Sequence, residues 1–153
     1  MERKILEIET LDAKRMRTLE LYLVGVAVFI VLSVTRFFFR LGELNSQPIG
    51  IAVFAGLILS LALISVSTIR SESLKRRLNQ DPALKEALNN ELVQTLERRS
   101  WKAAYLGAVG TTVFFAVAWF FYPISDPVLT ALTAIIAGGG AYQATFYFRY
   151  RSS

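Results

Sequence analysis

Four long apolar stretches dominate the pattern of hydrophobic and polar positions along the chain. Charge-free runs cover residues 21–35, 44–69, 103–125 and 127–148. The last three are 26, 23 and 22 residues long, and about 20 apolar residues allow a helix to cross the ~30 Å hydrocarbon core of a bilayer. The first run has 15 residues and reaches spanning length when the charged residues that flank it lie at the two interfaces. The pattern predicts an all-α integral membrane protein with four transmembrane helices, in preference to a soluble all-α core.

A different pattern precedes the first span. Ile5, Ile8 and Leu11 fall on one face of a helix and are separated by charged residues, which is typical of an amphipathic helix. We expect this N-terminal helix to pack in a cluster with other helices on the same side of the membrane. The alternative is a helix that lies on anionic lipid, which its basic residues would favour.

The segment between the second and third spans predicts a helical hairpin that extends both of them. Asp81 followed by Pro82 is typical of a helix N-cap and first helical position. Beyond them an apolar stripe recurs at every fourth residue, formed by Leu84, Leu88, Leu92 and Leu96. The returning end of the second helix offers mainly Leu74 and Leu78 to cover this stripe. We therefore expect the leucine stripe to bind a partner: the N-terminal helix, a second subunit or another protein.

These patterns divide the chain into membrane and non-membrane segments. The non-membrane segments are an amphipathic N-terminal helix (1–18), an outer loop (40–48), the hairpin (70–102), a second outer loop (123–127) and a tail (149–153). The four transmembrane helices are expected at 19–39, 49–69, 103–122 and 128–148.

The basic residues lie almost entirely on one side of this arrangement. Of 17 Lys and Arg residues, 15 fall in the N-terminal segment, the hairpin and the tail, and only Arg36 and Arg40 fall on the other side. Basic residues close to span ends stay in the cytoplasm. The bias predicts a multi-pass membrane protein with both termini in the cytoplasm. The layout resembles that of small four-span bacterial inner-membrane proteins, and this resemblance implies the bacterial inner membrane as its location and no particular activity.

Short cationic and aromatic segments end the first and last spans, as "TRFFFR" at 35–40 and "FYFRYR" at 146–151. Long cationic side chains at span ends bend toward lipid headgroups, and tyrosines there belong to the aromatic belt. We therefore expect four residues to contact lipid or anions: Arg36, Arg40, Arg149 and Arg151. Arg36 lies deeper than the others, so two alternatives remain for it. One is a functional anion or lipid pocket that faces the bundle, and the other is an ion pair with Asp126 or Glu43.

Small residues recur every fourth position in three of the spans, and such stripes let helix backbones approach closely in lipid. The residues expected at helix contacts are Ala52, Gly56, Ser60, Ala108, Thr112, Ala137, Gly138, Gly139, Gly140 and Ala141. The alternative for Gly138–Gly140 is a hinge or a ligand contact. The first span carries bulky Val, Phe and Ile residues instead of a small-residue row. We therefore expect the second, third and fourth spans to form the core, with the first span at its periphery.

The composition of the chain limits the chemical reactions and binding sites that it can provide. Cysteine and histidine are absent, which removes disulfides, thiolate nucleophiles and the usual zinc and haem sites. The four charge-free runs hold no Asp, Glu, Lys or His, although ionisable residues inside a membrane usually mark ion or proton pathways. We find no nucleophile set, phosphate loop or paired carboxylates, so we expect no enzyme, no catalytic residues, no metal and no cofactor. The net charge of +5 does not indicate nucleic-acid binding, because acids and bases are interleaved in the hairpin.

The sequence therefore favours a small non-enzymatic membrane protein that works by assembly, as a scaffold, adaptor or regulatory subunit. Its expected partners are membrane lipids, copies of itself or another membrane protein, and a cytoplasmic protein bound at the hairpin. The alternative is a homo-oligomeric channel or small-solute transporter. Its pore would be lined by hydroxyl side chains, with candidates Ser60, Ser65, Ser67, Thr111 and Thr112.

Overall fold

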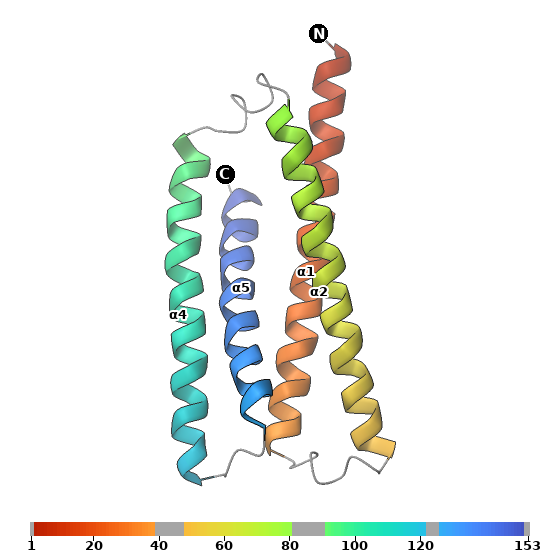
Figure 1. The fold of residues 1–153 in the computed structure, drawn as a ribbon. Helices are drawn as coiled ribbons and strands as arrows, with labels where there is room; N and C mark the ends of the chain where they lie inside the picture. The colour runs from red at the N-terminus through yellow and green to blue at the C-terminus, as the bar shows by residue number, and fades with distance from the viewer. Residues whose placement is uncertain (1, 39–47, 81–90, 122–125, 152–153) are drawn as a thin grey trace.

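Four long helices make up the described part of the chain. The computed structural model describes residues 2–38, 48–80, 91–121 and 126–151, with the side chains of 2–9, 12, 75, 77–80 and 91–93 excepted. The helices are α1 (Glu2–Phe38), α2 (Pro48–Gln80), α4 (Glu91–Phe121) and α5 (Pro127–Arg151) (Figure 1). No strand occurs in these residues. The tip of the predicted hairpin, with its expected N-cap Asp81, lies outside them.

Each helix contains a stretch that is long and apolar enough to cross a membrane. These stretches are Ala13–Phe38, Pro48–Leu74, Gln94–Phe121 and Pro127–Arg151. The prediction of an all-helical chain with four membrane-compatible helices is therefore confirmed.

The start of α5 shows how local sequence sets a helix boundary. Asp126 precedes the helix, and its Oδ1 accepts a hydrogen bond from the backbone N–H of Leu129 at 3.0 Å. Its carbonyl oxygen accepts the backbone N–H of Thr130 at 3.2 Å. Pro127 follows as the first helical residue, where its missing N–H is not needed. Asp126 is thus an N-cap whose carboxylate satisfies a backbone donor that the helix itself cannot.

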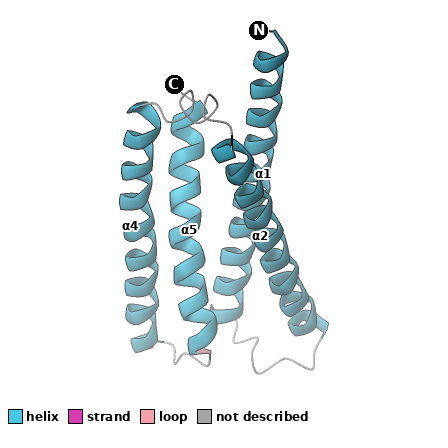
Figure 2. Cartoon of the chain, turned by 45° about the horizontal axis from the view of Figure 1, so that its top comes forward, coloured by secondary structure: helices cyan, strands magenta, loops and turns pink. Residues whose placement is uncertain are grey.

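The helices are arranged as two antiparallel pairs that are joined through α1 and α5. α1 packs against α2, α4 packs against α5, and α1 and α5 contact each other between the two pairs. Figures 1 and 2 show α5 lying between α4 and α1, while α2 crosses in front of α1. Both termini lie at one end of the molecule (Figure 1), which we call the terminal end. The other end, where α1 ends and α5 begins, we call the Asp126 end.

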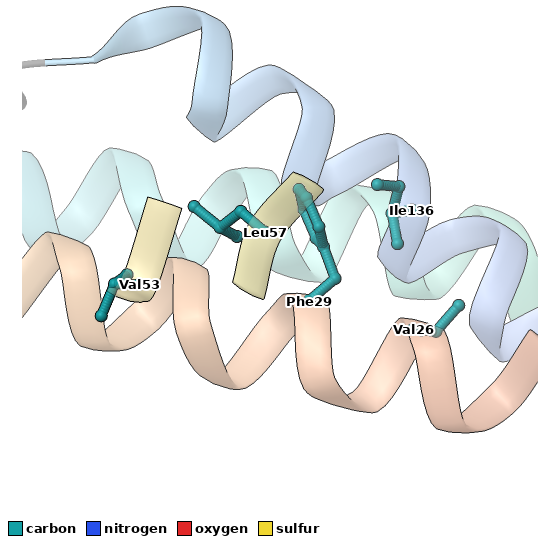
Figure 3. Packing of buried hydrophobic residues seen from close by; sticks show 5 residues of the cluster. All are labelled: Val26, Phe29, Val53, Leu57 and Ile136. Carbon is teal, nitrogen blue, oxygen red and sulfur yellow. The ribbon is translucent and has the colours of Figure 1, made fainter. Parts of the chain in front are cut away.

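The first span is central, so the prediction that it is peripheral is wrong. The main core cluster joins α1, α2 and α5 through Val26, Phe29, Val53, Leu57 and Ile136. Phe29 is fully covered, and it reaches between α2 and α5 toward Leu57 and Ile136 (Figure 3). The bulky side chains of α1 suggested a peripheral place. They are instead the residues that fill the space between its two neighbours.

Steric fit between large and small residues explains why α1 lies there. A Cβ built on Gly56 of α2 would lie 2.7 Å from Leu32 Cδ1 of α1. On α5, a Cβ built on Gly139 would lie 2.7 Å from the Tyr22 hydroxyl of α1. A Cβ built on Gly140 would lie 2.5 Å from Val26 Cγ1 of α1. Large α1 side chains therefore sit directly over glycines of α2 and α5, and van der Waals packing of this kind holds helices together in lipid.

The contact between α4 and α5 is of another type, with small residues on both sides. A Cβ on Gly138 would lie 3.0 Å from the carbonyl oxygen of Ala104 and 3.1 Å from Cβ of Ala108. A Cβ on Gly107 would lie 2.9 Å from Cβ of Ala141. The two backbones therefore approach each other more closely than larger side chains would permit.

Candidate functional site

Arg36, a mostly buried charged side chain of α1, is paired across two helices. Its Nη2 lies 3.7 Å from Oδ2 of Asp126, and the side chains are 14% and 40% exposed, respectively. Arg36 belongs to the last turn of α1, and Asp126 is the N-cap of α5. The sequence favoured lipid anchoring for Arg36, with an ion pair to Asp126 as an alternative. The geometry places Arg36 in that ion pair.

A small polar cavity adjoins this ion pair at the Asp126 end. Its lining includes Ser33 and Arg36 from α1, Thr130 and Thr133 from α5, and aromatic walls from Phe37 and Phe115. The space open to the centre of a water molecule is about 20 Å³, which is room for about one water. The Ser33 hydroxyl is buried and has no hydrogen-bond partner among the described residues. The Thr133 hydroxyl, equally buried, donates to the carbonyl oxygen of Leu129 at 2.7 Å.

A second polar link joins α1 and α5 near the terminal end. The Tyr147 hydroxyl donates a hydrogen bond to Oε1 of Glu20 at 2.7 Å. Nη1 of Arg151 donates to the same hydroxyl at 3.0 Å. Nearby, the Arg15 guanidinium lies 4.8 Å from the ring centre of Phe146, which is a cation–π distance. Sequence reasoning placed Tyr147 and Arg151 at a lipid interface and missed the hydrogen bond from Tyr147 to Glu20 of α1, because only the fold brings residues 20 and 147 together.

The two links lie near the opposite ends of the apolar core. Glu20 and Arg36 are 16 residues apart in α1, or about 24 Å along the helix. That separation is close to the thickness of the hydrocarbon core. Between them the α1–α5 contact includes the buried side chains of Ser33 and Thr133 and the Tyr22 hydroxyl over Gly139. The arrangement joins the two helix pairs to each other near both ends of the apolar core.

We expect Tyr147→Phe to lower the free energy of unfolding by about 1 kcal/mol, the usual net value of a hydrogen bond. The change removes a hydroxyl that donates to Glu20 and accepts from Arg151. Tyr105→Phe is the matched control, because Tyr105 is exposed on α4. Thermal unfolding in a mild detergent measures both variants. Equal midpoints would show that the link between α1 and α5 contributes nothing to stability.

The small residues expected at helix contacts divide into two groups. Gly56, Ala108, Gly138, Gly139, Gly140 and Ala141 lie at the helix contacts described above, and the carbonyl oxygen of Ala137 would lie 3.2 Å from a Cβ on Gly107. Ser60 is buried, and its hydroxyl donates to the carbonyl oxygen of Leu57 at 2.8 Å. Ala52 and Thr112 are exposed, and the Thr112 hydroxyl donates to the carbonyl oxygen of Ala108 in its own helix at 2.9 Å. Gly25 was not expected at a contact, yet its Cβ would lie 3.0 Å from Ile64 Cγ1 of α2.

The remaining predicted site residues fall largely outside the described part. Arg40, Leu84 and Leu88 lie in undescribed segments, and the side chain of Leu92 is not described. Leu96 is buried against Leu19, Phe146 and Tyr147. The last residue of the leucine stripe is therefore covered within the chain by α1 and α5. Arg149 is exposed at the terminal end.

Comparison with known proteins and the search for metal ligands add no further site. No protein-family model, curated protein sequence or solved structure matches the chain significantly. Among the described residues no group of His, Cys, Asp and Glu side chains is placed to hold a metal ion. The function is therefore inferred from the chain's own geometry.

Proposed function

We propose that this chain is a non-enzymatic, multi-pass protein of the bacterial inner membrane that acts by binding another polypeptide at its terminal end. The partner is a second copy of the chain or another membrane protein. In this proposal the terminal end is cytoplasmic, and residues 81–90 complete a helical hairpin between α2 and α4.

The observation that carries the proposal is that the helices project beyond their apolar stretches at one end only. At the Asp126 end, helix and apolar stretch stop together, at Phe38, Pro48, Phe121 and Pro127. At the terminal end, α2 continues from Leu74 to Gln80, and α1 extends back from Ala13 to Glu2. The α1 extension of 11 residues is about 16 Å long, and it rises past the ends of the other helices (Figure 1).

The charge distribution supports the cytoplasmic orientation of this end. The terminal end and the segments attached to it hold 15 of the 17 basic residues, and such residues are retained on the cytoplasmic side. The α1 extension is a continuous helix, so the face shared by Ile5, Ile8 and Leu11 stands outside the apolar stretch. An amphipathic helix of this kind gains by burying its apolar face against a partner.

Packing inside the chain argues against a pore through one molecule. Phe29 of α1 and Thr133 of α5 are both fully buried in the chain. The candidate pore hydroxyls belong to α2 and α4, which lie on opposite sides of the α1–α5 pair. Ser60 and Thr111 donate to carbonyl oxygens of their own helices. A channel would therefore need to form between several copies, and assembly remains the first property to test.

We expect Ile8→Glu to abolish crosslinking of the chain to its partner in native membranes while leaving membrane insertion intact. A carboxylate on the apolar face of the α1 extension opposes burial, because an unpaired charge is costly to remove from water. Leu6→Glu is the matched control, since helical spacing places Leu6 on the opposite side of the same helix. Unchanged crosslinking in Ile8→Glu, or equal loss in both variants, would contradict the proposal. In that case conductance across lipid bilayers becomes the decisive measurement.

A further inference from the structure

A basic groove lies between α1 and α2 at the terminal end. On α1, Lys14 and Arg17 line it one turn apart, and on α2 it is lined by Arg70. Its space open to the centre of a water molecule is about 430 Å³, compared with about 20 Å³ in the cavity beside Ser33. A volume of this size is within the range of small-ligand sites. The groove can therefore admit a group much larger than one water.

Three of the seven described residues that line the groove are cationic. No carboxylate is among the described residues that line it. The hydroxyls of Thr18 and Ser73, which also line it, donate to the carbonyl oxygens of Lys14 and Arg70, each at 2.8 Å. The three cations are thus the groove's free hydrogen-bond donors, and their mutual repulsion is relieved when an anion enters. Arginine presents a planar fork of donors that matches phosphate oxygens.

The position of the groove relative to the apolar stretches indicates which kind of anion the groove binds. The stretch in α1 begins at Ala13 and that in α2 ends at Leu74, so the groove lies at a boundary between hydrocarbon and water. Leu21, one turn deeper in α1 than Arg17, closes the groove on the membrane side. A ligand here meets the three cations together with two apolar side chains, Leu21 deeper in α1 and Leu74 one turn beyond Arg70 toward the terminal end. Phospholipid headgroups combine phosphate with acyl chains at this depth, and basic pockets between transmembrane helices recognise them.

We propose that this groove binds the phosphate-bearing headgroup of an anionic phospholipid. Arg17 and Arg70 hold the phosphate from opposite helices, Lys14 adds charge toward the water, and Leu21 contacts the start of an acyl chain. The site differs from the lipid contacts expected at Arg36, which lies at the Asp126 end, and at Arg149 and Arg151, which belong to α5. It does not depend on whether the chain assembles with a partner, because it is formed by α1 and α2 of one molecule.

The test measures retention of phosphatidylglycerol by the purified full chain in detergent, using native mass spectrometry, with phosphatidylcholine for comparison. We expect the double variant Arg17→Gln with Arg70→Gln to retain at least tenfold less phosphatidylglycerol than the wild type. Arg98→Gln with Arg99→Gln is the matched control, because it removes the same charge from exposed positions on α4 at the same end. The control should retain phosphatidylglycerol as the wild type does.

A second variant keeps the proposal testable if the double variant does not fold. Ser73 is exposed, so Ser73→Glu should fold and place a carboxylate among the three cations, with the same loss of lipid. Equal lipid loss in the control, or wild-type retention in Ser73→Glu, would overturn the proposal. Inorganic phosphate that displaces the lipid at millimolar concentration and protects the chain equally would assign the groove to a soluble phosphate instead.

Discussion

Gly107→Leu is expected to destabilise the protein by about 1–3 kcal/mol, the usual range for overpacking a close contact. Even a methyl group at Gly107 would lie 2.9 Å from Cβ of Ala141 and 3.2 Å from the carbonyl oxygen of Ala137. Because a backbone carbonyl cannot rotate away as a side chain can, the α4 and α5 helices would have to separate. Separation would also weaken the reciprocal contact at Gly138, so Gly138→Leu should show a loss of similar size.

Gly110→Leu provides the control for this prediction within the same helix. Gly110 lies one turn beyond Gly107 and has nothing within 4 Å of its built Cβ. It is exposed, so a leucine there meets lipid and should leave the unfolding midpoint nearly unchanged. Thermal unfolding of both variants in lipid-like detergent is the measurement. Equal midpoints for Gly107→Leu and Gly110→Leu would show that the close α4–α5 approach does not stabilise the chain.

Asp126→Ala is expected to cause the second large loss, because it removes two interactions at once. The carboxylate caps α5 through the backbone N–H of Leu129 and lies 3.7 Å from the Arg36 guanidinium. A lost N-cap costs about 1 kcal/mol. The half-exposed ion pair should add about 1–2 kcal/mol, between the values for exposed and buried pairs. Most of that second loss comes from leaving the Arg36 charge without its partner.

Asp126→Asn separates the two contributions, since asparagine caps a helix as well as aspartate does but carries no charge. This variant should lose only the contribution of the ion pair to the free energy of unfolding. A double-mutant cycle with Arg36→Gln then measures the coupling directly. If Asp126→Asn matches the wild type and the cycle shows no coupling, Arg36 is held by lipid and the anchoring interpretation is restored.

Local composition by itself determined the helical, membrane-compatible character of the chain. Runs of apolar residues long enough to cross a bilayer need no tertiary information, because helices satisfy their own backbone hydrogen bonds in lipid. The Asp126–Pro127 pair is likewise a local signal for the start of α5, since N-cap chemistry involves only neighbouring residues. The one-sided distribution of Lys and Arg is also read directly from the chain.

Tertiary structure alone decided which helices are neighbours and which polar groups meet. Lipid is as apolar as the helices, so hydrophobicity does not select contacts, and steric fit does. Bulky residues of α1 therefore appeared peripheral until Gly56, Gly139 and Gly140 were found opposite them. Residues far apart in sequence, such as Glu20 and Tyr147 or Arg17 and Arg70, come together only because α1 packs between α2 and α5. Their meeting depends on three-dimensional complementarity between helices, which no periodicity within one helix encodes.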